Sequence, residues 1–292
     1  MTIFILFSLS SLIGMLNSVL SKKFQQNFSA DFTHFIAYNF INALFACVYF
    51  FAANSFSLKP NGITFFFAVL LALIVISILI LQILALSVTS VSMLGIFSTA
   101  GSTILSTVFG LFFLGEPSSP RLFLSLFLLL AAVVIPYIPG RRVNKKNSFL
   151  ICLLMFIVSG LSVILQKIYT NTPGALSSTT FFLLTNLVIV FVCGFILLAK
   201  FLSDPASRTV ILKPFSKKQY LNIAIRTAAS NSTSVITLLL LSRMDVSVYS
   251  VVSSSLGILT GAFLSKVVFK EPMPLSSWIA VALVISSILL NV

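Results

Sequence analysis

The chain has 292 residues, of which 59% are hydrophobic and 8% are charged, and its formal net charge is +13. An ordinary soluble domain carries about 25% charged residues, so this composition excludes a water-soluble fold. The positive charge does not indicate a nucleic-acid-binding protein, because the basic residues lie in short gaps between long apolar runs. We therefore expect an all-α integral membrane protein.

Apolar runs of about 20 residues recur along the whole chain, and a helix of that length crosses a hydrocarbon core of about 30 Å. The first run, from Thr2 to about Ser21, has no basic residue before it and is followed by Lys22 and Lys23, the reverse of a signal peptide. We expect it to stay as a helix. In chain order, the runs predict ten transmembrane helices, near residues 2–21, 33–53, 63–87, 91–113, 121–139, 148–168, 178–200, 218–241, 246–269 and 275–291.

The two halves of the chain repeat each other. A shift of 155 residues places the Glu-Pro pair at Glu116 on the pair at Glu271, and a shift of 147 residues places Asn39 on Asn186. Similarity at a fixed offset indicates an internal duplication. The predicted organisation is a first five-helix repeat at 1–139, a basic linker at 140–147 and a second five-helix repeat at 148–292.

Most of the 18 Lys and Arg residues lie in the gaps after odd-numbered helices. Cytoplasmic loops carry an excess of these residues, so we expect those gaps to face the cytoplasm and both termini to lie outside a plasma or inner cell membrane. Because each half has an odd number of helices, the second half enters the membrane in the opposite sense to the first. The sequence therefore predicts two inverted repeats, which can rock between two mirror-like states. A passive bundle stabilised by duplication is the alternative.

Three features together resemble the EamA-like branch of the drug/metabolite transporter superfamily: five-plus-five helices, a short basic central gap, and a Glu-Pro pair at the end of the fourth helix of each half. The pair lies in LGEP at 114–117 and in FKEP at 269–272, where Lys270 departs from the family's glycine. The resemblance covers nearly the whole chain. It implies a ten-helix carrier for small organic molecules, in a family whose substrates range from amino acids to nucleotide sugars and toxic compounds.

We therefore expect a transporter that moves a small organic metabolite, an amino acid or another anionic or zwitterionic solute, by alternating access. A multidrug-type exporter of lipophilic compounds, a channel and a non-transporting scaffold are the alternatives. The sequence has no H-E-x-x-H or G-x-S-x-G motif, no cofactor loop and no metal-ligand spacing of its cysteines, so we expect no enzyme, cofactor or metal. The expected partners are the solute and membrane lipids, without nucleic acid; monomer and homodimer both remain open.

Arg226 is the first candidate for solute binding, because it lies about eight residues into its predicted helix, near the middle of the membrane. A central arginine costs about 2.5–3.5 kcal/mol on insertion scales, so it should face a wet cavity or a polar partner. Its guanidinium would suit a carboxylate or phosphate of the solute. The alternative is that the side chain reaches the cytoplasmic headgroups.

Amides inside the apolar runs are the other candidates for solute binding, because buried amides need partners in lipid. Hydrogen bonds between helices are the alternative explanation for each of them. Asn39 and Asn186 rank highest, since the repeat places them equivalently. The candidate amides are Asn17, Asn39, Gln82, Gln166, Asn186 and Asn231.

Small residues recur every four positions on the fourth and ninth predicted helices. Such faces allow backbones to approach closely, so we expect these two helices to pack together and a bulky side chain at Gly257 to impair folding or transport. The two ladders are Ser98, Ser102, Ser106 and Gly110, and Ser253, Gly257, Gly261 and Ser265.

The acidic residues all fall in gaps or at helix ends. Proton-coupled transporters commonly use a carboxylate within the membrane, so we favour facilitated or exchange transport. Glu116 and Glu271 each precede a proline at a helix end. We expect their carboxylates to accept hydrogen bonds from the exposed N–H groups of the next helix, a structural role.

Overall fold

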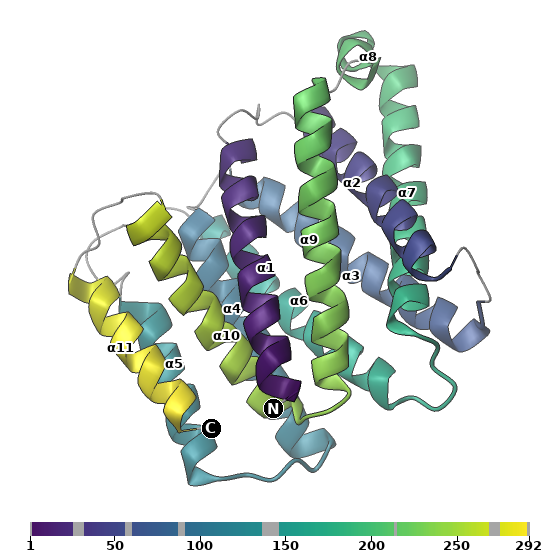
Figure 1. Ribbon diagram of the computed structural model, residues 1–292. Coiled ribbons are helices and arrows are strands. Elements are labelled where there is room, and N and C mark those ends of the chain that lie inside the picture. The colour runs from purple at the N-terminus through teal and green to yellow at the C-terminus, as the bar shows by residue number, and fades with distance from the viewer. Residues whose placement is uncertain are drawn as a thin grey trace. The chain divides into compact units, whose positions relative to one another are not determined.

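The computed structural model describes residues 2–25, 32–55, 60–86, 91–135, 146–212, 215–268 and 275–290. Within these ranges the chain is helical and contains no strand (Figure 1). The helices are α1 (Thr2–Gln25), α2 (Phe32–Ala53), α3 (Gly62–Leu86), α4 (Val91–Phe113), α5 (Pro120–Val134), α6 (Lys146–Asn171), α7 (Ser178–Ser203), α8 (Pro205–Leu212), α9 (Lys217–Leu241), α10 (Val246–Phe263), η2 (Leu264–Val268) and α11 (Leu275–Leu289).

Each of the ten predicted segments coincides with a helix that begins within two residues of the predicted start. Among the described residues, five helices are long and apolar enough to cross a membrane. These are α2, α7, α9 and the segments Gly62–Leu81 of α3 and Leu150–Asn171 of α6. The all-α fold is therefore confirmed, with apolar helices of membrane-spanning length.

Large apolar side chains lie on the outside of the protein. Phe112 is 79% exposed, Phe191 is 76% exposed and Phe4 is 75% exposed. In water, apolar exposure on this scale would mark an interaction surface. In lipid it is the ordinary exterior of a helical protein, because the acyl chains are as apolar as the side chains.

Two features of the helices were not predicted. The short helix α8 follows α7 after Asp204, which has an extended backbone with φ −131° and ψ 109°. Pro205 then supplies a φ suited to a first helical residue, and the Ser207 hydroxyl donates to Asp204 Oδ2 at 2.6 Å. The second feature is the π-helical turn η2, which directly follows α10 where one continuous helix was predicted.

The described residues form two compact units. Unit 1 comprises Met1–Phe7, Ile74–Asn171 and Leu240–Val292, and unit 2 comprises Ser8–Leu73 and Thr172–Leu239. Each unit therefore takes residues from both predicted repeats. The two units are defined by which residues lie close in space, and this does not test whether the sequence is duplicated. The division into repeats at 1–139 and 148–292 therefore stays a prediction.

In unit 1, α4 packs against α6 at very short range. A Cβ atom on Gly101 would lie 2.0 Å from the carbonyl oxygen of Phe156, and one on Gly160 would lie 2.8 Å from the carbonyl oxygen of Gly101. Only glycine allows this approach of the two backbones. The helices α4 and α6 are thus held together by dense packing rather than by hydrophobic exclusion of water.

The predicted packing of the fourth and ninth spans is confirmed, because α4 contacts α10. Hydroxyl pairs join them: Thr103 to Ser254 at 2.7 Å, and Thr107 to Ser250 at 3.2 Å. Of the predicted small-residue ladders, Gly110 makes the expected close approach, since a Cβ atom there would lie 2.8 Å from Cγ1 of Val246 on α10. Ser98 instead pairs with Ser159 on α6 at 2.8 Å, and Gly257 is exposed, so that a Cβ atom added there would meet no atom within 4 Å. The side chains of Gly261 and Ser265 lie outside the described residues.

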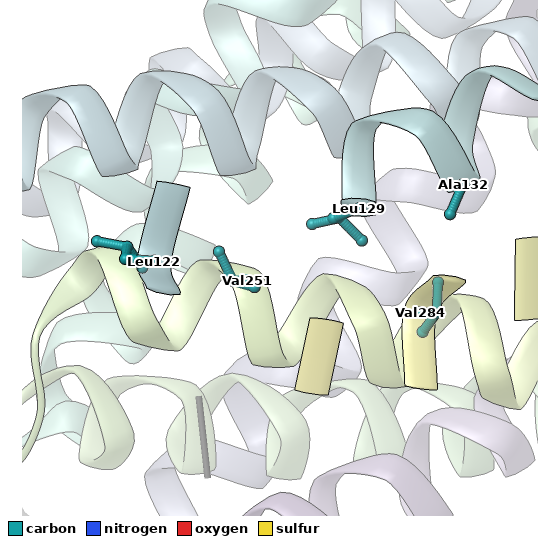
Figure 2. Packing of buried hydrophobic residues seen from close by; sticks show 5 residues of the cluster. All are labelled: Leu122, Leu129, Ala132, Val251 and Val284. Carbon is teal, nitrogen blue, oxygen red and sulfur yellow. The ribbon is translucent and has the colours of Figure 1, made fainter. Parts of the chain in front are cut away.

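A hydrophobic core of unit 1 forms where α5, α10 and α11 meet (Figure 2). Leu129 on α5, Val251 on α10 and Val284 on α11 are each no more than 1% exposed. Ser287 adds a hydrogen bond from its hydroxyl to the carbonyl oxygen of Ser125 at 2.9 Å. Because α5 and α11 are the fifth and tenth predicted spans, this core joins the ends of the two predicted repeats.

In unit 2, α2 packs most extensively against α7. The rings of Phe50 and Phe182 stack with centroids 5.6 Å apart, and Gly194 leaves room for the ring of Phe40. The helix α9 joins this pair through a cluster centred on Tyr38 and Ile223. This arrangement brings polar side chains of α9 to α1 and α2.

Candidate functional site

The helix α9 is the most polar of the five long apolar helices. Its mean hydropathy over the most apolar window is 1.2, whereas the other four range from 1.7 to 3.1. A spanning helix that carries this many polar groups must satisfy them within the protein or with a ligand, because lipid offers no hydrogen bonds. The candidate site therefore centres on α9.

Arg226 is half-buried and contacts α1 and α2. Its Nε donates to Asn17 Oδ1 at 3.3 Å, and its Nη1 donates to the hydroxyl of Tyr38. The guanidinium carbon also lies 5.4 Å from the centroid of the Tyr38 ring, within the range of a cation–π contact. Arg226 thus faces polar partners inside unit 2, and both partners are neutral.

Two further pairs link α2 to α9. Thr227 donates from its hydroxyl to Asn42 Oδ1 at 2.6 Å, and the hydroxyls of Tyr49 and Ser232 lie 2.8 Å apart. The pair of Tyr38 with Arg226 comes first, and all three pairs follow in the same order along α2 and along α9. The helices α2 and α9 therefore run in the same direction, and a row of polar groups lies between them.

Of the seven sequence-predicted site residues, the structure brings Arg226 and Asn17 together. Three of the amides bond to their own helices: Asn39 Nδ2 donates to the carbonyl of Phe35 at 2.9 Å, Asn186 Nδ2 to Phe182 at 2.8 Å, and Gln166 Nε2 to Ser162 at 3.2 Å. Asn39 and Asn186 make the same i−4 contact, which agrees with their equivalence in the repeat. The side chain of Gln82 lies outside the described residues.

Two amide atoms on α9 are buried without a hydrogen-bond partner in the part of the chain that the structure describes. They are Nδ2 of Asn231, a predicted site residue, and Oδ1 of Asn222. An unpaired buried polar atom costs about 1–3 kcal/mol, so such atoms call for a ligand or a water. Asn222 precedes Arg226 by four residues and therefore shares its face of the helix, whereas Asn231, five residues on, does not.

Sequence reasoning missed Tyr38, Thr227, Tyr49 and Ser232. Tyrosine, threonine and serine are ordinary residues of apolar helices, and nothing in their spacing separates these four from the many that pack against lipid or their own backbone. The one available signal was the position of Tyr38 beside the candidate Asn39 on the second predicted span. This position does not indicate a functional role until it is known which helix packs against Tyr38.

Glu116 has a structural role, but the predicted target was wrong. Its carboxylate accepts hydrogen bonds from the N–H groups of Val246 at 2.6 Å and Ser247 at 3.0 Å, and from the Ser247 hydroxyl at 2.6 Å. It therefore caps α10, not the next helix. The next helix, α5, is capped by Ser119, whose hydroxyl accepts from the N–H of Leu122 at 3.2 Å. Glu271 lies outside the described residues.

No family model matches the sequence, and no curated protein matches it. The fold is similar to that of a solved structure described as "Crystal structure of protein", with a TM-score of 0.70 and 14% sequence identity. The match covers 99% of this chain and 96% of that chain. At this identity the similarity concerns the fold alone.

Proposed function

We propose that the protein is a transporter that moves a small anionic or zwitterionic organic solute across a cell membrane by alternating access. In this proposal ten helices cross the membrane as two inverted five-helix repeats, as in EamA-like drug/metabolite transporters, with both termini outside. The observation that carries the proposal is the guanidinium of Arg226, held within an apolar span by two neutral side chains.

The charge of Arg226 lies deep in the span. Arg226 is the ninth residue after Lys217, so at 1.5 Å per residue it lies about 14 Å from the start of α9. The sequences of α1, α2 and α9 contain no Asp or Glu. A desolvated cation without a counter-charge is costly, and the contacts with Asn17 and Tyr38 reduce that cost without neutralising the charge. A carboxylate or phosphate of the solute would supply the missing negative charge.

The guanidinium also has donors to spare. Of its three nitrogens, Nε and Nη1 donate to Asn17 and Tyr38, and no acceptor for Nη2 lies among the described residues. A solute oxygen can therefore bind at Nη2. One turn earlier on the same face, the unpaired Oδ1 of Asn222 can accept from an ammonium or hydroxyl group of the solute. Together these atoms favour a solute that carries an anionic group next to a donor.

The direction of the helices supports the proposed topology. The spans α2 and α9 both follow gaps rich in Lys and Arg, so both would run from the cytoplasm outward. The parallel order of the pairs that join Tyr38 to Arg226, and Tyr49 to Ser232, agrees with that requirement. Facilitated or exchange transport remains part of the proposal, because the chain offers no carboxylate within these three helices for a proton to bind.

Ligand-induced stabilisation of the purified full-length protein tests the site. Amino acids, organic acids, nucleotides, sugars and lipophilic cations would be screened for their effect on the melting temperature of the wild type, Arg226→Gln and Arg243→Gln. Arg243 is an exposed arginine that follows α9, so its variant is a control for loss of charge. We expect an anionic or zwitterionic solute to stabilise the wild type and the control but not Arg226→Gln. Stabilisation by lipophilic cations alone, equal in all three proteins, would favour a multidrug-type exporter.

Counterflow in proteoliposomes then separates a carrier from a channel. Solute placed on the far side of the membrane should accelerate uptake of labelled solute by a carrier, because the loaded site returns faster than the empty one. If the rate of uptake is the same with and without solute on the far side, alternating access is contradicted and a pore is indicated.

A further inference from the structure

The segment between α7 and α9 is the most basic stretch of unit 2. Residues 200–218 hold Lys200, Arg208, Lys213, Lys217 and Lys218, against one acidic residue, Asp204. Both α7 and α9 have the length and hydropathy of membrane spans. The helix α8, which follows α7 directly, must therefore lie at a membrane surface, and Figure 1 shows it beyond the end of α7.

One face of α8 is fixed to the protein. Ser207 is 5% exposed, its hydroxyl lies 3.2 Å from the hydroxyl of Thr33 at the start of α2, and it donates to Asp204. The only acidic group of the segment is thus engaged in this anchor. Because α8 is held in place on α2 and α7, its other face has a defined orientation.

A cation and exposed apolar side chains lie together on α8, which carries Arg208 and Leu212, and on the adjoining end of α7, which carries Phe201 and Leu202. Arg208 is exposed; its Nε donates to the carbonyl of Phe201 at 2.8 Å, and its guanidinium carbon lies 5.6 Å from the centroid of the Phe201 ring. Leu202 is 68% exposed and Leu212 is 75% exposed. Nη2 also donates to the carbonyl of Leu202 at 3.5 Å, so contacts with the end of α7 fix the guanidinium, and no acceptor for Nη1 lies among the described residues. Lys217 and Lys218, also exposed, lie nine and ten residues after Arg208, at the start of α9.

We propose that α8 and the start of α9 bind the headgroup of an anionic phospholipid through Arg208, Lys217 and Lys218. Each Lys or Arg near an anionic membrane contributes about 1 kcal/mol of attraction, and an exposed apolar side chain beside it matches the boundary between headgroup and acyl chain. The exposed Leu202 and Leu212 distinguish a lipid from free phosphate, which has no acyl chain to cover them. This inference does not depend on transport and requires only that the protein lies in a membrane.

Binding of phosphatidylglycerol to the full-length protein in detergent, with phosphatidylcholine as reference, tests the proposal by titration and by melting temperature. The variants are Lys217→Gln/Lys218→Gln and Arg208→Gln, and the control is Arg243→Gln, which removes an exposed charge beyond the other end of α9. The double lysine variant is informative even if Arg208→Gln loosens α8, because both lysines are exposed at the helix start. At about 1 kcal/mol per charge, we expect affinity for phosphatidylglycerol to fall about fivefold per charge removed, with the control unchanged.

Three outcomes would overturn the proposal. Equal affinity of the wild type and the double lysine variant would show that the segment is not the binding site. An equal loss of affinity in Arg243→Gln would show that the effect depends on the net charge of the protein and not on this segment. An equal melting shift with inorganic phosphate or glycerol phosphate would indicate an anion site that does not recognise lipid.

Discussion

The ammonium group of Lys167 on α6 donates a hydrogen bond to the carbonyl oxygen of Leu241, the last residue of α9, at 2.8 Å. It donates a second bond to the carbonyl of Met244 in the following turn, also at 2.8 Å. Just beyond, Glu116 accepts from the first N–H groups of α10. A cation thus meets the negative end of α9 and an anion meets the positive end of α10, so the two charges together hold the turn between these helices.

Replacing Lys167 by Met should therefore destabilise unit 1. Methionine matches the unbranched stem of lysine without the terminal ammonium, so the change leaves the carbonyls of Leu241 and Met244 without their donor, at a cost of about 1–3 kcal/mol of unfolding free energy. Thermal or denaturant unfolding of the purified protein in detergent measures the loss. Lys218→Met, at an exposed lysine, is the matched control and should unfold like the wild type. Equal stability of both variants would contradict a role for Lys167 in this turn.

Glu116→Gln should also lower stability, for a different reason. The amide retains one acceptor oxygen but turns its NH2 group toward an N–H donor of Val246 or Ser247, so one bond is replaced by a contact between two donors. We expect a loss of about 1–3 kcal/mol in the same unfolding measurement. Ser247→Ala removes one of the three donors and leaves both backbone bonds in place, so its loss should be smaller. The reverse order of the two losses would show that the hydroxyl, not the helix cap, carries the interaction.

Gly101→Ala and Gly257→Ala should have opposite consequences. The new Cβ at position 101 would lie 2.0 Å from the backbone of α6, which forces α4 and α6 apart at a cost of at least about 1–3 kcal/mol. At position 257 the methyl group meets open space, and the higher helix propensity of alanine favours stability by up to about 1 kcal/mol. Yield of folded protein on gel filtration and the melting temperature compare the two. A damaging Gly257→Ala would support the small-residue packing expected from the sequence.

Tyr38→Phe tests how Arg226 is positioned. The ring remains for the cation–π contact, but Nη1 of Arg226 loses its acceptor, so the guanidinium is less well oriented for a solute anion. We expect the affinity for the stabilising solute to fall about fivefold, the equivalent of about 1 kcal/mol. Tyr49→Phe, which removes the hydroxyl paired with Ser232, is the control along the same helix. An unchanged affinity in Tyr38→Phe would leave Arg226 oriented by Asn17 alone.

Much of the secondary structure could be predicted from the sequence, because apolar runs in lipid must be helical to satisfy their backbone. The start of α4 at Val91 and that of α10 at Val246 agree with the predicted starts. The helix α8 escaped prediction, since eight residues with a basic and partly polar sequence carry no spanning signal. Its start depends on local features, the extended Asp204 and the following proline.

The candidate site could be predicted only in part. Arg226 and Asn17 stand out because each is polar within an apolar run, and the structure brings them together. Tyr38 could not be recognised, because its significance depends on which helix lies opposite. Glu116 shows the same limit. That its carboxylate accepts hydrogen bonds from the N–H groups at a helix start could be predicted, but the helix concerned begins at Val246, 130 residues away, and is not the next helix.

The pairing of α5 with α11 in the core around Leu129 and Val284 has a consequence for biosynthesis. The helix α5 is synthesised well before α11, because four long helices, α6, α7, α9 and α10, lie between them in the chain. Until α11 is made, α5 can pack against α10 through Val251, but the part of the core that Val284 fills stays open. A chain that ends before α11 therefore lacks one wall of this core, so the last described helix stabilises a helix made much earlier, and its loss should weaken unit 1 as a whole.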